Sequence, residues 1–189
     1  NTSSLTALLS VLTLGITLAA EDILGNVAGG LVILSSHPFA LGDFIEAGGT
    51  SGTVREIGLN HTKLENANDQ MILMPNKDLS SSKIINYTVL GRRRIVRTVT
   101  ASYDAPTETV MTACMEAVEA TANILPDPAP AVHLTDYGAS SIEYTIYCWC
   151  TVENYWPAYH SINEKLRDTF AKHNVEMTYD HLNVHILDK

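Results

Sequence analysis

The hydrophobic and polar positions divide the chain into one long uncharged helical stretch and two regions of shorter elements. Residues 2–20 carry no charge, and the first charged residues are Glu21 and Asp22. An uncharged run of about 18 or more residues is long enough to cross a bilayer as a helix. A stretch of small residues with helical spacing follows over 23–36 and ends at a turn over 37–39. We therefore predict a membrane-spanning helix, a bend, and a second helix near the membrane surface.

The uncharged helix is polar for one that faces lipid. Hydroxyl side chains share one face and small or short side chains share a neighbouring face: Ser10, Thr13 and Thr17 on the first, and Ala7, Val11 and Gly15 on the second. Stripes of this kind let helices approach closely and hydrogen-bond across the contact. The pattern favours packing against copies of the same helix.

Leu14 and Leu18 are four residues apart and therefore lie on one side of this helix. In a ring of such helices they would form an apolar constriction, and constrictions of that type gate by dewetting. The periodicity alone is equally compatible with a plain membrane anchor, whose stripes would serve packing only.

After Pro38 the pattern changes to short strands separated by turn residues. Five strands are predicted, at 43–47, 53–57, 62–65, 71–74 and 84–87. The turn at Asn68-Asp69 is typical of a hairpin. A glycine-rich run over 48–52 lacks the ending of a phosphate-binding loop and lies between strands, so we interpret it as a turn. Five short strands predict a small, strongly bent sheet or partial barrel.

The last region begins after an arginine-rich junction at 91–94 and alternates strands with helices. Strands are predicted at 95–102, 131–136, 142–151 and 182–186. One helix starts near Pro106 and a second follows Pro157; their apolar faces are Val110, Ala113, Cys114, Ala117 and Val118 in the first, and Tyr159, Ile162, Leu166 and Phe170 in the second. This order is that of a ferredoxin-like split unit.

Composition narrows the functional classes. The net charge of −9, from 21 acidic and 12 basic residues, argues against a nucleic-acid partner and against a polybasic membrane patch. Three cysteines do not make a disulfide framework, which favours a reducing compartment. We find no nucleophile–base motif, so we expect no enzyme activity and no cofactor. The chain starts at Asn1 without a visible signal peptide, and we expect a fragment of a longer protein.

Several motifs occur in one order along the chain and resemble a known family. They are Ala19–Asn26, Gly29–Leu34, His37–Ile45, Gly52–Gly58, Met74–Lys77, Ile84–Tyr87, Tyr103-Asp104 and Leu134–Ser141. Together they are similar to the pore-helix, linker and soluble-domain motifs of the small-conductance mechanosensitive channel (MscS) family.

The resemblance implies a membrane protein of α+β class with four parts. These are a pore-lining helix with a kinked continuation (1–37), an Sm-like β-domain (38–90), a ferredoxin-like α/β domain (91–180) and a C-terminal strand of a parallel barrel (181–189). It further implies a homoheptamer in a bacterial-type inner membrane, with the soluble domains in the cytoplasm and two lipid-contacting helices preceding the pore helix.

The resemblance also assigns roles to individual residues. Leu14 and Leu18 fall on the family's pore-sealing leucines, and Asn26 falls on an asparagine near the bend that contacts the neighbouring domain. Asp22 replaces the usual kink glycine, which leaves Gly25 as the nearest flexible residue, and Glu21 replaces an amide. The hydroxyl residues at 10, 13 and 17 stand where better-known members have glycines.

Three groups of residues keep two interpretations each. In the pair Glu21-Asp22, either Asp22 simply caps or begins the second helix, or the Glu21 carboxylates form a cation-favouring ring at the pore exit. Arg92, Arg93 and Arg94 either pair with acidic neighbours or bias the ions passing the side portals of the soluble part. Cys148 and Cys150 on a strand face, and His181 and His185 on another, are interpreted as packing and solvent-facing positions, with no metal site expected.

We therefore predict a channel that opens when membrane tension rises and releases ions and small solutes after hypo-osmotic shock. An exporter of solutes such as amino acids is the alternative within the same fold. A membrane-anchored, ligand-gated module and a structural oligomer without transport are the alternatives from other classes.

Overall fold

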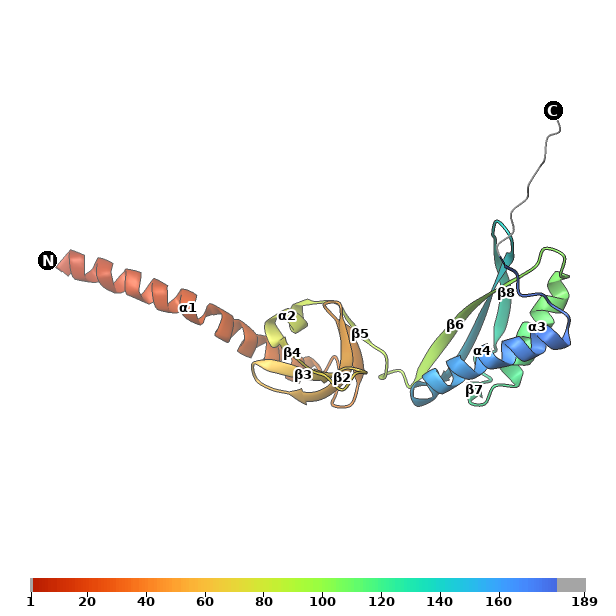
Figure 1. Cartoon of the computed structure of the whole chain (residues 1–189). Helices are drawn as coiled ribbons and strands as arrows, with labels where there is room; N and C mark the ends of the chain where they lie inside the picture. The colour runs from red at the N-terminus through yellow and green to blue at the C-terminus, as the bar shows by residue number, and fades with distance from the viewer. Residues whose placement is uncertain (1, 180–189) are drawn as a thin grey trace, which may run out of the picture. The chain divides into compact units, whose positions relative to one another are not determined.

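The computed structural model of the 189-residue chain describes residues 2–179, which form two compact units (Figure 1). The first unit ends at Val89 and the second begins at Leu90. Each unit has its own hydrophobic core, so the two are described separately.

Helix α1 (Thr2–Ser36) is the first element, and it is longer than predicted. The prediction of two helices separated by a bend at Glu21-Asp22 is wrong, because helical structure continues through both residues. Sharp bends need a proline, a glycine pair or a group inserted into the hydrogen-bond ladder. Glu21 and Asp22 supply none of these, and the side chain of Asn26 bonds back to the Asp22 carbonyl at 2.9 Å.

The rest of the first unit is a five-stranded antiparallel sheet, which we call the β-domain. Its strands have the spatial order β4-β3-β2-β1-β5 and the bounds β1 (Phe44–Ala47), β2 (Thr50–Ile57), β3 (His61–Glu65), β4 (Met71–Pro75) and β5 (Ile84–Asn86). All five predicted strands are present. A short helix, α2 (Asn76–Ser81), was not predicted.

Two of the turns explain why the strands pair as they do. Gly48 and Gly49 have φ angles of 57° and 75° and connect β1 to β2 as a two-residue hairpin. Asp69, with φ of 56°, lies in the predicted hairpin between β3 and β4. The core of the β-domain includes Ile33 of α1, so the carboxyl end of this helix is part of the domain.

The second unit places two helices against a sheet whose central strand is β9. Its elements are β6 (Arg92–Ala101), α3 (Thr107–Glu119), β7 (Ile124–Leu125), β8 (Ala131–Tyr137), β9 (Ile142–Thr151), a short 3-10 helix (Val152–Asn154) and α4 (Tyr155–Lys172). Strand β9 pairs antiparallel with β6, β7 and β8. The predicted helices and three of the four predicted strands are present, while the strand predicted at 182–186 lies outside the described residues.

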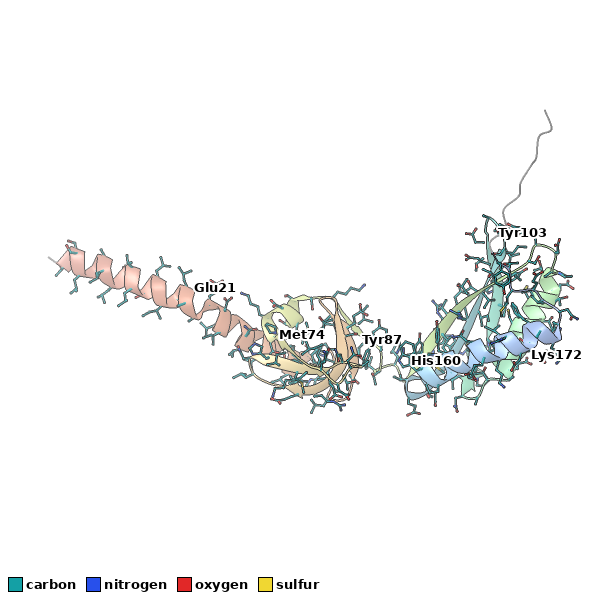
Figure 2. All side chains as sticks on the ribbon, in the orientation of Figure 1. Glu21, Met74, Tyr87, Tyr103, His160 and Lys172 are labelled. Carbon is teal, nitrogen blue, oxygen red and sulfur yellow. The ribbon has the colours of Figure 1, made fainter. Side chains whose placement is uncertain are left out.

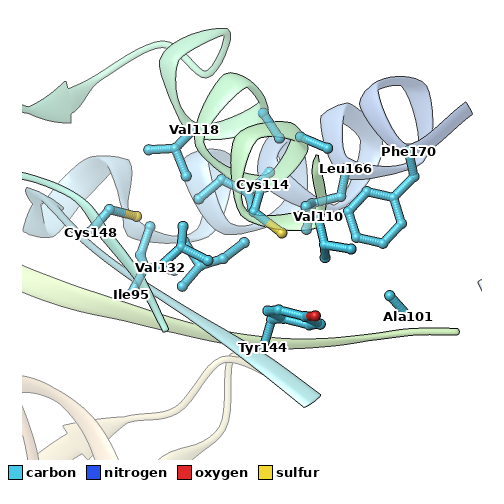
Figure 3. Packing of buried hydrophobic residues seen from close by; sticks show 14 of the residues in the cluster. Ile95, Ala101, Val110, Cys114, Val118, Val132, Tyr144, Cys148, Leu166 and Phe170 are labelled. Carbon is cyan, nitrogen blue, oxygen red and sulfur yellow. The ribbon is translucent and has the colours of Figure 1, made fainter. Parts of the chain in front are cut away.

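The core of this unit lies between the sheet and the two helices (Figure 3). The predicted apolar face of α3 is fully buried there, as are Ile162 and Phe170 of α4. Cys148 and Cys150 lie in the same core, as the packing interpretation predicts. Burial raises the pKa of Cys148 to about 11 and that of Cys114 to about 12, so these thiols are protonated at neutral pH.

Candidate functional site

The amino-terminal half of α1 stands away from the rest of its unit. All side chains over 2–19 are exposed (Figure 2). By length and composition, α1 is also long and apolar enough to cross a membrane. Leu14 and Leu18 are 59% and 61% exposed. Soluble proteins rarely leave so large an apolar surface uncovered. This surface therefore requires lipid or another chain as its partner.

The hydroxyl side chains of this half are satisfied within the helix itself. Thr6, Ser10, Thr13 and Thr17 each donate a hydrogen bond to the carbonyl four residues earlier, at 2.8–2.9 Å. Thr6 extends the predicted stripe by one turn, and its spacing of four from Ser10 is the signal that could have identified it. Because each hydroxyl hydrogen is already bonded to a carbonyl of the same helix, the stripe presents small side chains against which another helix could pack closely.

A stripe of four large aliphatic side chains lies on the opposite side of the helix from Leu14 and Leu18. They repeat at helical spacing and are all exposed: Leu5, Leu9, Leu12 and Ile16. Since each residue advances about 100° around the axis, this stripe and the Leu14/Leu18 stripe point in nearly opposite directions. Small residues at Ala7, Val11 and Gly15 flank the leucine pair. The helix thus has one bulky face and one face narrow enough for a neighbour to approach.

The second half of α1 docks on the β-domain through one face, which carries Asp22, Gly25, Asn26 and Gly29 at helical spacing. We call this contact the joint. The side-chain oxygen of Asn26 accepts a hydrogen bond from the backbone N–H of Lys77 at 3.0 Å. The ammonium group of Lys77 donates to the Asp22 carboxylate at 3.0 Å. The charge and hydrogen bond of Asp22 raise the pKa of Lys77, with a smaller contribution from Glu21.

Glycines make the joint close. A Cβ atom on Gly29 would lie 2.5 Å from the carbonyl oxygen of Asn76, and one on Gly30 would lie 2.7 Å from the Asn76 side-chain nitrogen. Real side chains do not approach backbone so closely, so only glycine allows α1 to pack directly on the start of α2. A Cβ on Gly25 would lie 3.0 Å from Cδ of Lys77, which shows that the lysine stem crosses the helix there.

Asn76 holds the receiving side of the joint together. It is fully buried, accepts a hydrogen bond from Thr62 at 2.8 Å, and donates to the carbonyls of Gly58 and Leu59 at 2.8 and 3.0 Å. Asn76 and Lys77 belong to the family motif Met74–Lys77, but the motif does not mark them as contacts of the helix. Their role depends on a pairing across about 50 residues of chain, which local patterns do not reveal.

Of the four residues predicted at the kink and pore exit, the structure brings three together at the joint. Glu21 is exposed, and the side chain of Asp22 is exposed apart from its contact with Lys77 (Figure 2). The carboxylate of Asp22 is therefore paired with a lysine, whereas Glu21 acts on the same lysine only through a weaker electrostatic attraction.

The arginines of the predicted portal region lie on β6 in the second unit and contact aromatic rings. The guanidinium carbon of Arg92 is 5.2 Å from the centre of the Trp149 ring, that of Arg93 is 3.7 Å from Tyr155, and that of Arg94 is 5.2 Å from Tyr147. Such stacking orients an arginine while keeping its charge. It adds a contact that neither sequence interpretation had considered.

Among residues 2–179 no group of three or more His, Cys, Asp or Glu side chains is arranged to hold a metal ion. His181 and His185 fall outside that range.

Comparison with known proteins identifies the family. Two family models match the chain: "Mechanosensitive ion channel, beta-domain" over residues 22–89 and "Mechanosensitive ion channel MscS, C-terminal" over 95–177. The chain belongs to the MscS family of mechanosensitive ion channels. This is a family of channels rather than of enzymes.

Individual relatives agree with this assignment. The small-conductance mechanosensitive channel of Edwardsiella ictaluri is 30% identical over 173 residues, which cover 92% of this chain and 60% of that protein. The channel MscMJ of Methanocaldococcus jannaschii is 31% identical over 190 residues, covering 96% of this chain and 54% of that protein. The chain thus spans about three fifths of the length of these curated relatives.

Solved structures share the fold. The closed-state crystal structure of Helicobacter pylori MscS matches with a TM-score of 0.94 and 25% identity, over all of this chain and 75% of that one. The cryo-EM structure of Arabidopsis thaliana MSL1 matches with a TM-score of 0.78 and 29% identity, covering 94% of this chain and 66% of that one. The helix and the β-domain that follows it are therefore the arrangement of an MscS-type fold.

Proposed function

We propose that this chain is the pore helix and soluble part of a channel that opens under membrane tension and releases ions and small solutes on hypo-osmotic shock. The observation that carries the proposal is the two-faced, uncharged half of α1. It has a bulky aliphatic face suited to lipid and a narrow face suited to other helices, and it continues without a break into the docked half of the same helix.

The channel would be a homoheptamer in the inner membrane, with its soluble domains in the cytoplasm. In that ring Leu14 and Leu18 point toward the axis and exclude water, while the small and hydroxyl residues pack neighbouring helices together. Tension favours the state with the larger in-plane area, so the helices move outward and the leucine ring widens until water fills it.

The second unit would form the remaining part of the soluble domains. Its strand order β6-β9-β8 supports a ferredoxin-like split unit; the barrel strand expected at 181–189 lies outside the described residues. Arginines 92–94, at the start of β6, would lie near the side portals and favour anions there.

We also propose that the described conformation is the closed one. The support is the TM-score of 0.94 with the closed-state structure of Helicobacter pylori MscS. The contacts of α1 with the β-domain then belong to the closed channel.

The test is a patch-clamp recording of the full-length protein in membranes without other such channels, with suction applied in steps. Leu18→Ser is expected to open at lower suction, because a hydroxyl in the ring lowers the cost of wetting. Leu12→Ser, on the aliphatic face, is the matched control and is not expected to lower the threshold.

The outcomes separate the alternatives. Openings at the same suction in Leu18→Ser and wild type would contradict the dewetting seal. Silence of the wild type up to patch rupture would contradict tension gating and favour an exporter or a ligand-gated module.

A further inference from the structure

The joint has an inner part that is buried and an outer part that is exposed. At the inner part Gly29 and Gly30 are buried against the backbone of Asn76 and Leu59. At the outer part the side chains of Lys77 and Asp22 are 46% and 87% exposed. The inner part holds by close packing, which salt does not weaken. The outer part holds by charge, which salt does weaken.

Asp22 bonds to the β-domain near the point where the exposed half of α1 begins. Residues 2–19 are exposed, and Asp22 lies one helical turn before Asn26, the next residue bonded to Lys77. The Asp22–Lys77 ion pair therefore lies at the boundary between the docked half of α1 and its free half.

The geometry directs Lys77 to this position. Its stem crosses the helix over Gly25, where even a methyl group would lie 3.0 Å from Cδ. Its backbone N–H is fixed to Asn26 at the same time. The stem over Gly25 and the backbone bond to Asn26 together bring the ammonium group to 3.0 Å from the Asp22 carboxylate.

We propose that the Asp22–Lys77 pair is an ionic-strength-sensitive latch between the pore helix and the β-domain. It keeps the 22–26 segment of α1 on the β-domain in the closed channel, and rising salt on the soluble side releases it. The two charges are exposed, so dissolved salt screens their attraction. The Debye length falls from about 10 Å at 0.1 M salt to about 3 Å at 1 M, which weakens the pair.

This latch rests on the proposed function, because its consequence is a change in the tension needed for opening. An exposed pair contributes little by itself. In a channel whose subunits open together, however, each subunit contributes the same small free energy. The sum over all subunits can change the opening equilibrium measurably.

The experiment compares opening suction of the full-length protein in excised patches at low and high salt on the soluble-domain face, with osmolality balanced. Lys77→Met keeps the stem over Gly25 and the backbone bond and removes only the charge, and Asp22→Asn keeps the shape of the carboxylate. Lys63→Met is the matched control, because it removes an exposed ion pair, Lys63–Glu56 at 2.7 Å, that lies wholly within the β-domain.

In wild type and Lys63→Met we expect the threshold to fall as salt rises. Lys77→Met and Asp22→Asn should open at the lower, high-salt threshold already in low salt and lose the dependence on salt. At fixed suction in low salt, the opening equilibrium should favour the open state by roughly fivefold or more over wild type. The double variant should show no further change, because both substitutions remove one interaction.

Wild-type thresholds and salt dependence in both single variants, in a channel that does open under suction, would overturn the latch and leave the proposed function standing. Amide hydrogen exchange over 20–30 in the full-length protein in detergent gives a second measurement that needs no channel activity. If the wild type never opens, the proposed function fails. Faster exchange in Lys77→Met than in Lys63→Met would then still support the latch as a contact, and equal exchange would overturn it.

Discussion

Both halves of α1 contain glycines, but the glycines have different surroundings in the two halves. In the docked half, Gly29 and Gly30 lie against the backbone of the β-domain, so their missing side chains are explained within the chain. In the free half, a Cβ on Gly15 would have nothing within 4 Å. A small residue in open space is compatible with any side chain in the single chain. Under the proposed function, a helix of a neighbouring subunit would provide the close contact that requires a small residue at Gly15.

The largest expected effect separates these two glycines. Gly30→Val should destabilise the β-domain by about 3 kcal/mol or more, because its side chain would overlap the Leu59 carbonyl and Asn76. Gly15→Val should leave the unfolding free energy of the β-domain unchanged, and should alter assembly or the suction threshold instead. Equal loss of β-domain unfolding free energy in both variants would remove the distinction between the halves.

Asn76→Ala tests the receiving side of the joint. It removes the acceptor of the Thr62 bond and the donor of two bonds to backbone carbonyls, and leaves those partners buried. We expect a loss of about 2–3 kcal/mol in unfolding free energy, measured by denaturant titration. Thr62→Val is the companion variant, with a smaller loss because it removes only one of these bonds. A stability near wild type for Asn76→Ala would mean that the glycines alone hold the joint.

The smallest effect concerns the two adjacent carboxylates at the boundary between the halves. Glu21→Gln should shift the reversal potential in a salt gradient toward lower cation preference, because the exposed Glu21 carboxylate would add negative charge at the proposed pore exit. Asp22→Asn should shift it less, because Lys77 already balances that charge. An unchanged reversal potential in Glu21→Gln would rule out the acidic ring.

Much of the fold could be predicted because its signals are local. All five strands of the β-domain and both helices of the second unit follow from periodicity and turn residues, and the burial of Cys148 follows from strand alternation. The short helix α2 and the two-residue β7 were missed, since elements of that length carry too few residues to establish a period.

The candidate site was predictable only in part. Helical spacing identified the faces of Leu14 and of the hydroxyl stripe, and the family resemblance identified Asn26. No local signal could show that Asp22 meets Lys77, 55 residues later. The bend expected after Ala20 rested on the change of composition there, but a change of composition does not interrupt the hydrogen bonds of a helix.

By itself, the sequence determined which residues share a face, which of the longer segments become helix or strand, and to which family the chain belongs. These properties depend on periods of two or about 3.6 residues and on the order of motifs, and both can be read along the chain. Only the tertiary structure decided that α1 is continuous, that Lys77 crosses Gly25 to reach Asp22, and that the arginines of β6 lie over aromatic rings. Each of these depends on how one element sits against another, which side-chain volume and backbone approach settle only when the chain has folded.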